Sequence, residues 1–249
     1  MLHFRPHWSF TLIFLPFFAA LVALGVWQIE RLNWKLGLIA EMNHNLALPP
    51  LSLNAAMKLG DVAQYHNVAL NGAFDNAKEA YVFTTGPGGA PVYHVVTPFV
   101  LDDGRTMLVD RGYVLTTMRD PSTRLSGEIV GKRTIVGVWR TPDASGSFTP
   151  KPDLAHRVWY ARDLAGIAKT GHVTLASPVI VEADATPNPG GWPKGGQTVV
   201  DLPNDHLQYA IIWFTLAFGL LCIFLAFHVS QGRLGLKPAA RGLGCISGD

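Results

Sequence analysis

The stretch Ala210–Phe227 reads AIIWFTLAFGLLCIFLAF, which is 18 residues without a charged side chain. Near the other end of the chain, Phe10–Trp27 reads FTLIFLPFFAALVALGVW, again 18 residues without a charge. Because a helix rises about 1.5 Å per residue, each run covers roughly 27 Å, close to the thickness of the hydrocarbon core of a bilayer. Aromatic rings, which favour the wet boundary of a bilayer, stand near the ends of both runs: Trp8, Trp27, Tyr209 and Trp213. The sequence therefore predicts two transmembrane helices, over residues 9–27 and 207–227.

The overall composition agrees with a membrane protein. Hydrophobic residues make up 49% of the 249 residues and charged residues 15%, against roughly a quarter charged in an ordinary soluble domain. The formal net charge is +2. This composition excludes a disordered chain, and the small net charge excludes a typical nucleic-acid-binding protein. The partner expected from composition alone is a lipid bilayer, with no nucleic acid.

Each apolar run has an alternative interpretation. The first run could be the apolar part of a cleaved signal peptide, with Arg5 before it. However, it continues without a small-residue cleavage site into QIERLNWKLGLIAEM (28–42), which has a helical pattern. The second run could be a buried core helix, but 18 residues without a charge favour a membrane span.

The basic residues predict the orientation of the two spans. Arg233, Lys237 and Arg241 follow the second span, whereas the segment 185–206 before it holds only Lys194. By the positive-inside rule the C-terminus is cytoplasmic, and two spans place the N-terminus on the same side. We therefore expect a two-span protein, in a bacterium one of the inner (plasma) membrane, with five parts: a cytoplasmic tail (1–8), a span (9–27), a domain in the periplasm or an equivalent intermembrane space (28–206), a span (207–227) and a cytoplasmic tail (228–249).

The central segment 28–206 contains no cysteine, since Cys222 lies in the second span and Cys245 in the tail. It therefore carries no disulfide, no thiolate metal site and no paired-Cys copper motif. Short apolar and β-branched runs alternate in it with turn signals, and LDDGR (101–105) is a strong hairpin signal. The predicted strands are 65–74, 79–85, 92–100, 106–114, 132–140, 157–160 and 178–182. This pattern predicts a mainly-β domain, a small antiparallel barrel or sandwich, flanked by the two transmembrane helices.

We expect one or two short helices in this domain. The segment Asn54–Asp61 is predicted to be helical with Asn54 as N-cap, and Asp163–Lys169 to be helical with Asp163 as N-cap. The sequence shows no nucleophile elbow, P-loop, dinucleotide fingerprint, HExxH or paired-carboxylate signature. The protein is therefore not expected to be an enzyme.

Among the nine histidines, His206 has a distinctive place. It stands directly before the second apolar run, and helical spacing puts it on one face with Tyr209, Ala210 and Trp213. A neutral imidazole beside apolar and aromatic surface is suited to be an axial ligand of haem iron. The alternative is an interfacial polar residue that only ends a helix. His66 and His94 lie in strand patterns and are interpreted as structural.

At the end of the first run, Trp27, Arg31, Trp34 and Lys35 share one helical face. The planar guanidinium of Arg31 is suited to carboxylates such as haem propionates. The alternative is an ordinary interfacial anchor whose cation reaches the water.

Several blocks of the chain resemble the Surfeit locus protein family of cytochrome c oxidase assembly factors. The first and last blocks are GVWQIERLNWK (25–35) and LPNDHLQYAIIWFTLAF (202–218). Between them, in the family's order, stand NGAF (71–74), HVVTPFVLDDGRTMLVDRGYV (94–114), SFTP (147–150), VWYARDLAGIA (158–168) and PNPGGWPKGG (187–196). The chain departs from the family at Asp110, where the family often has Asn, and at Ile212, where it often has Thr.

The resemblance implies a role in maturing haem-a-containing cytochrome c oxidase, with oxidase subunit one and the haem a synthase as partners. It implies that His206 is the haem ligand and that Trp27, Gln28, Arg31 and Tyr209 form a supporting pocket. The protein would bind haem a transiently and assist its insertion into subunit one. The alternatives are a scaffold that stabilises subunit one without binding haem, and a membrane-anchored enzyme with its site in the β domain.

Overall fold

The computed structural model describes residues 2–142, 146–198 and 202–236. The chain divides into two compact units, which are described separately. One unit comprises the terminal segments Met1–Leu38 and Leu202–Asp249, and the other is the central segment Ile39–Asp201.

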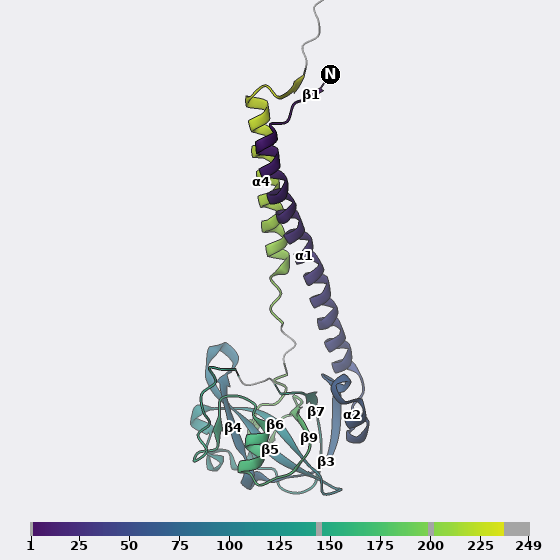
Figure 1. The fold of residues 1–249 in the computed structure, drawn as a ribbon. Coiled ribbons are helices and arrows are strands. Elements are labelled where there is room, and N and C mark those ends of the chain that lie inside the picture. The colour runs from purple at the N-terminus through teal and green to yellow at the C-terminus, as the bar shows by residue number, and fades with distance from the viewer. Residues whose placement is uncertain (1, 143–145, 199–201, 237–249) are drawn as a thin grey trace, which may run out of the picture. The chain divides into compact units, whose positions relative to one another are not determined.

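The terminal unit is built from two long helices that lie side by side and antiparallel (Figure 1). Helix α1 spans Trp8–Ala47 and α4 spans His206–Ser230, and both are long and apolar enough to cross a membrane. Beyond the helices, β1 (Leu2–Phe4) pairs antiparallel with β10 (Leu234–Leu236). Backbone hydrogen bonds therefore join the segment before α1 to the segment after α4.

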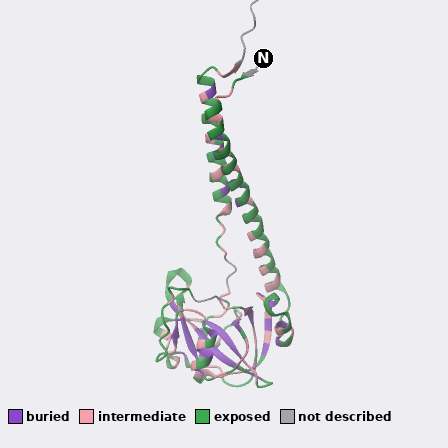
Figure 2. Ribbon diagram, viewed as in Figure 1, coloured by how far each residue is buried: buried purple, intermediate pink, exposed green. Residues whose placement is uncertain are grey.

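Aromatic rings and one glycine hold α1 and α4 together. The rings of Phe14 and Phe224 stack with centroids 4.1 Å apart, and Phe10 lies 4.7 Å from Phe227. A Cβ on Gly25 would lie 2.7 Å from the ring of Phe214, so any larger residue would require that ring to shift. Most other apolar side chains on both helices are exposed, as expected of surfaces that face lipid (Figure 2).

The central unit is a closed β-barrel (Figure 1). Its five strands are β3 (Asn67–Phe74), β5 (Pro91–Leu101), β6 (Thr106–Leu115), β7 (Arg133–Arg140) and β9 (Leu175–Ala183). They pair in the order β3-β7-β9-β6-β5, and β5 pairs back with β3 to close the ring. Strand direction cannot alternate all the way around a ring with an odd number of strands. The barrel accordingly contains one parallel pair, β6–β9, and is otherwise antiparallel.

Shorter elements surround the barrel. Strand β2 (Leu51–Ser52) pairs with β3, β4 (Ala80–Thr85) pairs with β5, and β8 (Val158–Trp159) pairs with β4. The two short helices are α2 (Leu53–Leu59) and α3 (Leu164–Thr170). The remaining helical pieces are 3-10 turns over residues 60–63, 76–78, 87–89, 116–118, 121–127 and 189–191.

In β5, β6 and β9 a run of consecutive residues is buried, so both faces of these strands are covered there, whereas β3 and β7 are partly exposed. In β6, Met107 and Val109 belong to the cluster inside the barrel, whereas Leu108 belongs to a second cluster with α3. In β9, Val179 and Val181 belong to the cluster inside the barrel, whereas Ile180 belongs to the second cluster. Successive side chains of a strand point to opposite faces, so a stretch covered on both sides carries apolar residues at consecutive positions. Figure 2 shows long stretches of these strands as buried.

Gly72 allows the barrel to close. At this residue β3 pairs with β7 through Arg133 on one side and with β5 through Leu101 on the other. A Cβ on Gly72 would lie 2.1 Å from the carbonyl oxygen of Val100, a distance that no side chain can occupy. The glycine of the NGAF block is therefore required by the meeting of the first and last strands of the ring.

The mainly-β prediction is confirmed, and the barrel rather than the sandwich is observed. The LDDGR segment forms the predicted hairpin turn between β5 and β6, and Asp163 caps α3 by accepting a hydrogen bond from Gly166 N–H. The predicted cap of the other short helix is wrong. Ser52 caps α2, because the helix begins at Leu53, one residue earlier than expected, and Ala55 N–H then reaches the serine hydroxyl.

Candidate functional site

His206 is the first residue of α4. The segment before it, Pro203 to Asp205, is unsuited to a helix interior, since proline lacks a backbone N–H and Asp favours turns. The first hydrogen bond of the helix runs from Tyr209 N–H to the carbonyl oxygen of Asp205. The imidazole is therefore fixed to the end of a long helix rather than to a loop.

The imidazole of His206 is oriented by Gln28 on α1. The two side chains meet with His206 Nδ1 2.7 Å from Gln28 Oε1. An amide oxygen only accepts, so Nδ1 carries the proton and donates it to Gln28. Nε2 then holds the lone pair, and in the described part of the chain it has no hydrogen-bond partner. Metal-binding histidines are oriented in this way, with one ring nitrogen held by an acceptor and the other directed at the metal.

His228, at the other end of α4, has no such free nitrogen. Its Nδ1 lies 2.8 Å from the carbonyl oxygen of Phe224, and its Nε2 accepts from His7 N–H at 3.1 Å. The ring is fully buried among phenylalanines of both helices, the nearest being Phe224 with centroids 4.2 Å apart. His228 therefore joins the helix ends and is not available as a ligand.

Arg31 stands one turn after Gln28 on α1 and lies against two indole rings. Its guanidinium carbon is 5.8 Å from the centroid of the Trp27 ring and 5.0 Å from that of Trp34. Spacings of four and three residues put all three side chains on one helical face, as predicted. Among the described residues no carboxylate lies within ion-pair distance of Arg31. Its N–H groups are therefore free to bind an external carboxylate.

Lys35 ties α1 to the segment before α4. Its Nζ donates a hydrogen bond to the carbonyl oxygen of Pro203, three residues before His206. Together with the Gln28–His206 pair, this contact fixes the start of α4 against α1 at two points.

The structure brings some of the predicted site residues into contact and leaves others apart. Gln28 is 8% exposed and bonded to His206, whereas Trp27 contacts Arg31 and is 47% exposed. Tyr209 lies one turn along α4 from His206 and is 51% exposed, and in the described chain its side chain forms no hydrogen bond or ring pair with the other predicted site residues. The site therefore has one part-buried polar pair, Gln28 and His206, and an exposed rim of aromatic side chains.

The central unit contains a buried charge cluster that the sequence reasoning missed. The Arg124 guanidinium donates to both Glu79 and Glu128, and Tyr81 Oη donates to Glu79 Oε1 at 2.7 Å. Burial, reinforced by the Glu79 carboxylate, raises the pKa of the Tyr81 hydroxyl and keeps it protonated. Burial also raises the pKa of Glu128. These residues are widely spaced in the sequence, and only the fold joins them.

A second buried pair involves His94, which the sequence assigned a structural place in a strand. Its Nδ1 lies 2.7 Å from Asp110 Oδ2 across the β5–β6 ladder. Burial opposes protonation of His94, but the Asp110 carboxylate outweighs it and raises the pKa of the imidazole. Burial likewise opposes ionisation of Asp110, yet His94 and Arg162 hold its pKa below the ordinary value. At Asp110, a position where the chain departs from the resembled family, the charge forms an ion pair.

The described residues contain no group of three or more His, Cys, Asp or Glu side chains that would hold a metal ion by themselves. A metal bound at His206 must therefore bring its other ligands with it. Haem iron does so, because the porphyrin supplies four nitrogens and leaves axial positions for the protein. The free Nε2 of His206, the Arg31 guanidinium and the exposed aromatic side chains around them fit such a group.

A family model and individual relatives that match this chain point to the same family. The model of the SURF1 family matches residues 15–218. The chain is 36% identical over 227 residues to Surfeit locus protein 1 of Mus musculus, covering 82% of this chain and 72% of that protein. It is 35% identical over 214 residues to Surfeit locus protein 1 of Homo sapiens, covering 78% and 69%. It is 29% identical over 228 residues to a SURF1-like protein of Rickettsia bellii (strain RML369-C), covering 90% and 92%.

Proposed function

The chain belongs to the SURF1 family, and from that membership we propose that it is an assembly factor for haem-a-containing cytochrome c oxidase. In this role it binds haem a and assists its insertion into oxidase subunit one. Its partners are then subunit one, which receives the haem, and the haem a synthase, which supplies it. The role is that of a carrier and involves no bond-making step.

The observation that carries the haem-binding part is the hydrogen bond between His206 and Gln28. It holds the imidazole in the tautomer whose Nε2 lone pair is free, at the edge of an apolar helix pair. His228 supports the same assignment by contrast, because both of its ring nitrogens are used within the protein. Of these two helix-end histidines, only His206 is prepared to donate a lone pair to iron.

The residues around His206 have supporting roles in this proposal. Arg31 would bind a haem propionate, since its guanidinium is held by Trp27 and Trp34 and has no carboxylate of its own in the described chain. Trp27 and Tyr209 would provide aromatic surface for the porphyrin, and both are about half-exposed. Haem a supplies the redox-active iron that the finished oxidase uses, and this chain holds and orients it.

We place the protein in the bacterial inner membrane with both termini cytoplasmic and the central domain periplasmic. The antiparallel pairing of α1 and α4 supports a two-span topology with both termini on one side. The basic residues after the second span support a cytoplasmic side for those termini. His206 then lies at the periplasmic boundary of the bilayer.

The test is the haem content of the full-length protein purified from cells that also make haem a. We expect the wild-type protein to carry haem a and the His206→Ala variant, at equal protein level, to lose most of it. His44→Ala is the matched control, because His44 is an exposed imidazole on α1 that lies far along the helix from Gln28.

Two results would contradict the proposal at different points. An unchanged haem spectrum in His206→Ala would remove His206 as the ligand. A wild-type protein that is free of haem but still binds subunit one would favour the alternative of a haem-free scaffold.

A further inference from the structure

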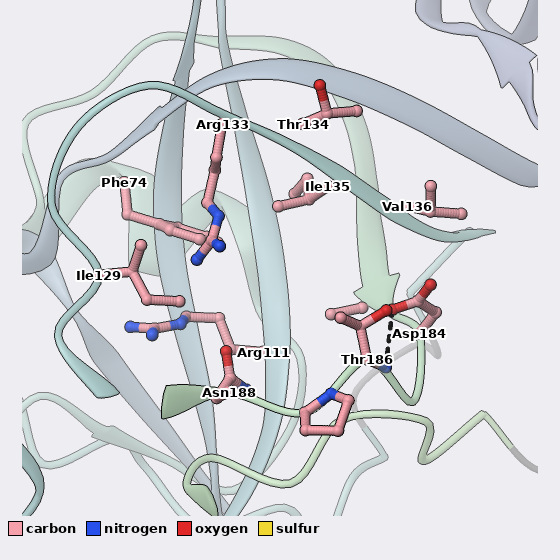
Figure 3. Close-up of a pocket in the computed structure, with 12 residues that line it drawn as sticks. Phe74, Arg111, Ile129, Arg133, Thr134, Ile135, Val136, Asp184, Thr186 and Asn188 are labelled. Atoms are coloured by element: carbon pink, nitrogen blue, oxygen red, sulfur yellow. Dashed lines mark hydrogen bonds between the residues drawn. The ribbon is translucent and has the colours of Figure 1, made fainter. Parts of the chain in front are cut away.

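The central unit contains a cavity of about 140 Å³ between the end of β3 and the start of β7 (Figure 3). Phe74 from the end of β3, Arg111 from β6 and Arg133 from the start of β7 line it. Asp184 and Asn188, from the loop after β9, complete its wall. Neither the proposed haem site nor the membrane helices contribute to this cavity.

Arg111 is buried here, and the carboxylate that it pairs with, Glu79, is shared with Arg124. Its side chain is 1% exposed, its nearest carboxylate atom belongs to Glu79 at 3.8 Å, and Glu79 is already bonded to Arg124. One terminal nitrogen of Arg111 donates to the carbonyl oxygen of Gly127 and the other to Asn76 Oδ1 at 3.4 Å, whereas Nε has no hydrogen-bond partner among the described residues. The guanidinium lies over the Phe74 ring, 4.6 Å from the centroid. A buried N–H without a partner carries a desolvation cost that a bound acceptor would remove.

Arg133 adds a second cation to the same cavity. In Figure 3 its guanidinium points toward Arg111, and within the described chain it forms no ion pair. Burial lowers the pKa of Arg111 and outweighs the opposing attraction of Glu79 and Glu128, and repulsion from Arg124 and Arg133 acts in the same direction as burial. Two neighbouring cations facing one cavity are stabilised when an anion lies between them.

The rest of the lining restricts the anion. Asp184 is the one carboxylate among the lining residues, and its Oδ1 accepts from Thr186 N–H at 3.0 Å, so the two arginines outnumber it. Phe74, Ile129 and other apolar side chains make part of the wall, which suits carbon rather than a fully hydrated ion. A cavity of roughly 150 Å³ holds benzene, so this one accommodates a group of about six heavy atoms.

We propose that this cavity binds a carboxylate carried on a short apolar stem, with Arg111 and Arg133 contacting the carboxylate and Phe74 and Ile129 contacting the stem. Two sources offer this chemistry: a free short-chain acid, and a glutamate side chain of a partner protein. The site is independent of haem binding at His206.

The experiment uses the full-length protein in detergent and titrates it with propionate, followed by calorimetry and by the shift in melting temperature. Propionamide has the same shape without the charge, and inorganic phosphate has the charge without the stem. Glutamate blocked at both its amino and α-carboxyl groups represents the peptide-borne source. The test variant is Arg133→Gln, and the matched control is the adjacent Lys132→Gln, which removes the same charge from a side chain that is 79% exposed and paired with Asp102.

We expect propionate to bind at least tenfold more tightly than propionamide or phosphate. We expect Arg133→Gln to weaken propionate binding at least tenfold and Lys132→Gln to leave it within twofold. Tighter binding of the blocked glutamate than of propionate assigns the carboxylate to a partner protein, and the reverse order assigns it to a free acid.

The proposal is overturned if propionate and propionamide bind the wild-type protein equally, a comparison that needs no variant to fold. It is also overturned if Arg133→Gln and Lys132→Gln have the same effect. Loss of haem in His206→Ala leaves both comparisons unchanged, so this proposal and the haem proposal fail separately.

Discussion

Replacing Gln28 by leucine tests how the protein prepares His206. Gln28 is 8% exposed, and its Oε1 accepts the Nδ1 proton of His206 at 2.7 Å. Leucine has a similar volume and fills the same space between the helices, but it removes the acceptor. The imidazole is then free to rotate and to change tautomer, so its Nε2 lone pair is no longer held toward a ligand.

The expected effect is a loss of haem affinity rather than a loss of folding. Removing the partner that orients a metal-binding histidine lowers metal affinity about 10- to 100-fold. That range corresponds to about 1.4–2.8 kcal/mol of binding free energy. Gln28→Glu is the matched variant, because it keeps an acceptor oxygen at the same position, and we expect it to retain affinity within a few-fold.

The measurement is the haem dissociation rate of the purified full-length protein, with an apo-acceptor protein capturing released haem. The melting temperature of each haem-free variant shows whether the helix pair is intact. Equal dissociation rates for the wild type and Gln28→Leu, with both folded, would refute the argument that Gln28 orients the ligand. A Gln28→Glu variant as impaired as Gln28→Leu would show that packing matters here and the hydrogen bond does not.

The remaining predictions concern the stability of the central domain. Arg124→Leu removes the cation that is hydrogen-bonded to the buried Glu79 carboxylate and to the partly buried Glu128, so we expect it to destabilise the domain by about 3–5 kcal/mol in denaturant unfolding, whereas Lys151→Leu at an exposed position changes stability by less than about 0.5 kcal/mol. Asp110 and His94 predict a pH dependence. The pKa of His94 is raised, so its stabilising contribution is complete below about pH 6.5 and is lost as the pH rises through its folded value. The pKa of Asp110 is lowered, so its contribution is present above about pH 3.9 and is lost on further acidification. The pair therefore stabilises most at about pH 4–6.5. Melting temperatures across pH 5–9 should fall for the wild type and fall less for Asp110→Asn, and identical pH profiles would contradict the ion pair.

The fold was largely predictable because its signals are local. The strand boundaries follow from apolar and β-branched runs between turn residues, and β6 (Thr106–Leu115) begins at the predicted residue and ends one residue later. The predicted first strand, 65–74, began too early, since Tyr65 has a positive φ of 65° and β3 starts at Asn67. The short strand β2 (Leu51–Ser52) was hidden in a proline-containing linker and forms only because β3 offers it an edge.

The candidate site was predictable in part. The place of His206 at the start of α4 and the shared face of Trp27 and Arg31 follow from helical spacing alone. Spacing along one helix cannot show which residue of the other helix it meets. The resemblance to a known family grouped Gln28 with His206, but the hydrogen bond that fixes the ring tautomer appears only when the two helices are packed.

By itself the sequence determined the two long apolar helices near opposite ends of the chain, the strand-rich segment between them and the histidine at the start of the second helix. These follow from hydropathy, charge and turn signals, each of which acts over a few neighbouring residues. Only the tertiary structure decided that five strands close into a ring at Gly72 with one parallel pair. It also decided that Gln28 orients His206, that both ring nitrogens of His228 are hydrogen-bonded within the protein, and that Arg111 and Arg133 share a cavity. These features depend on side chains far apart in the sequence. Packing brings them together, and buried polar groups then bond to whichever partners lie within reach.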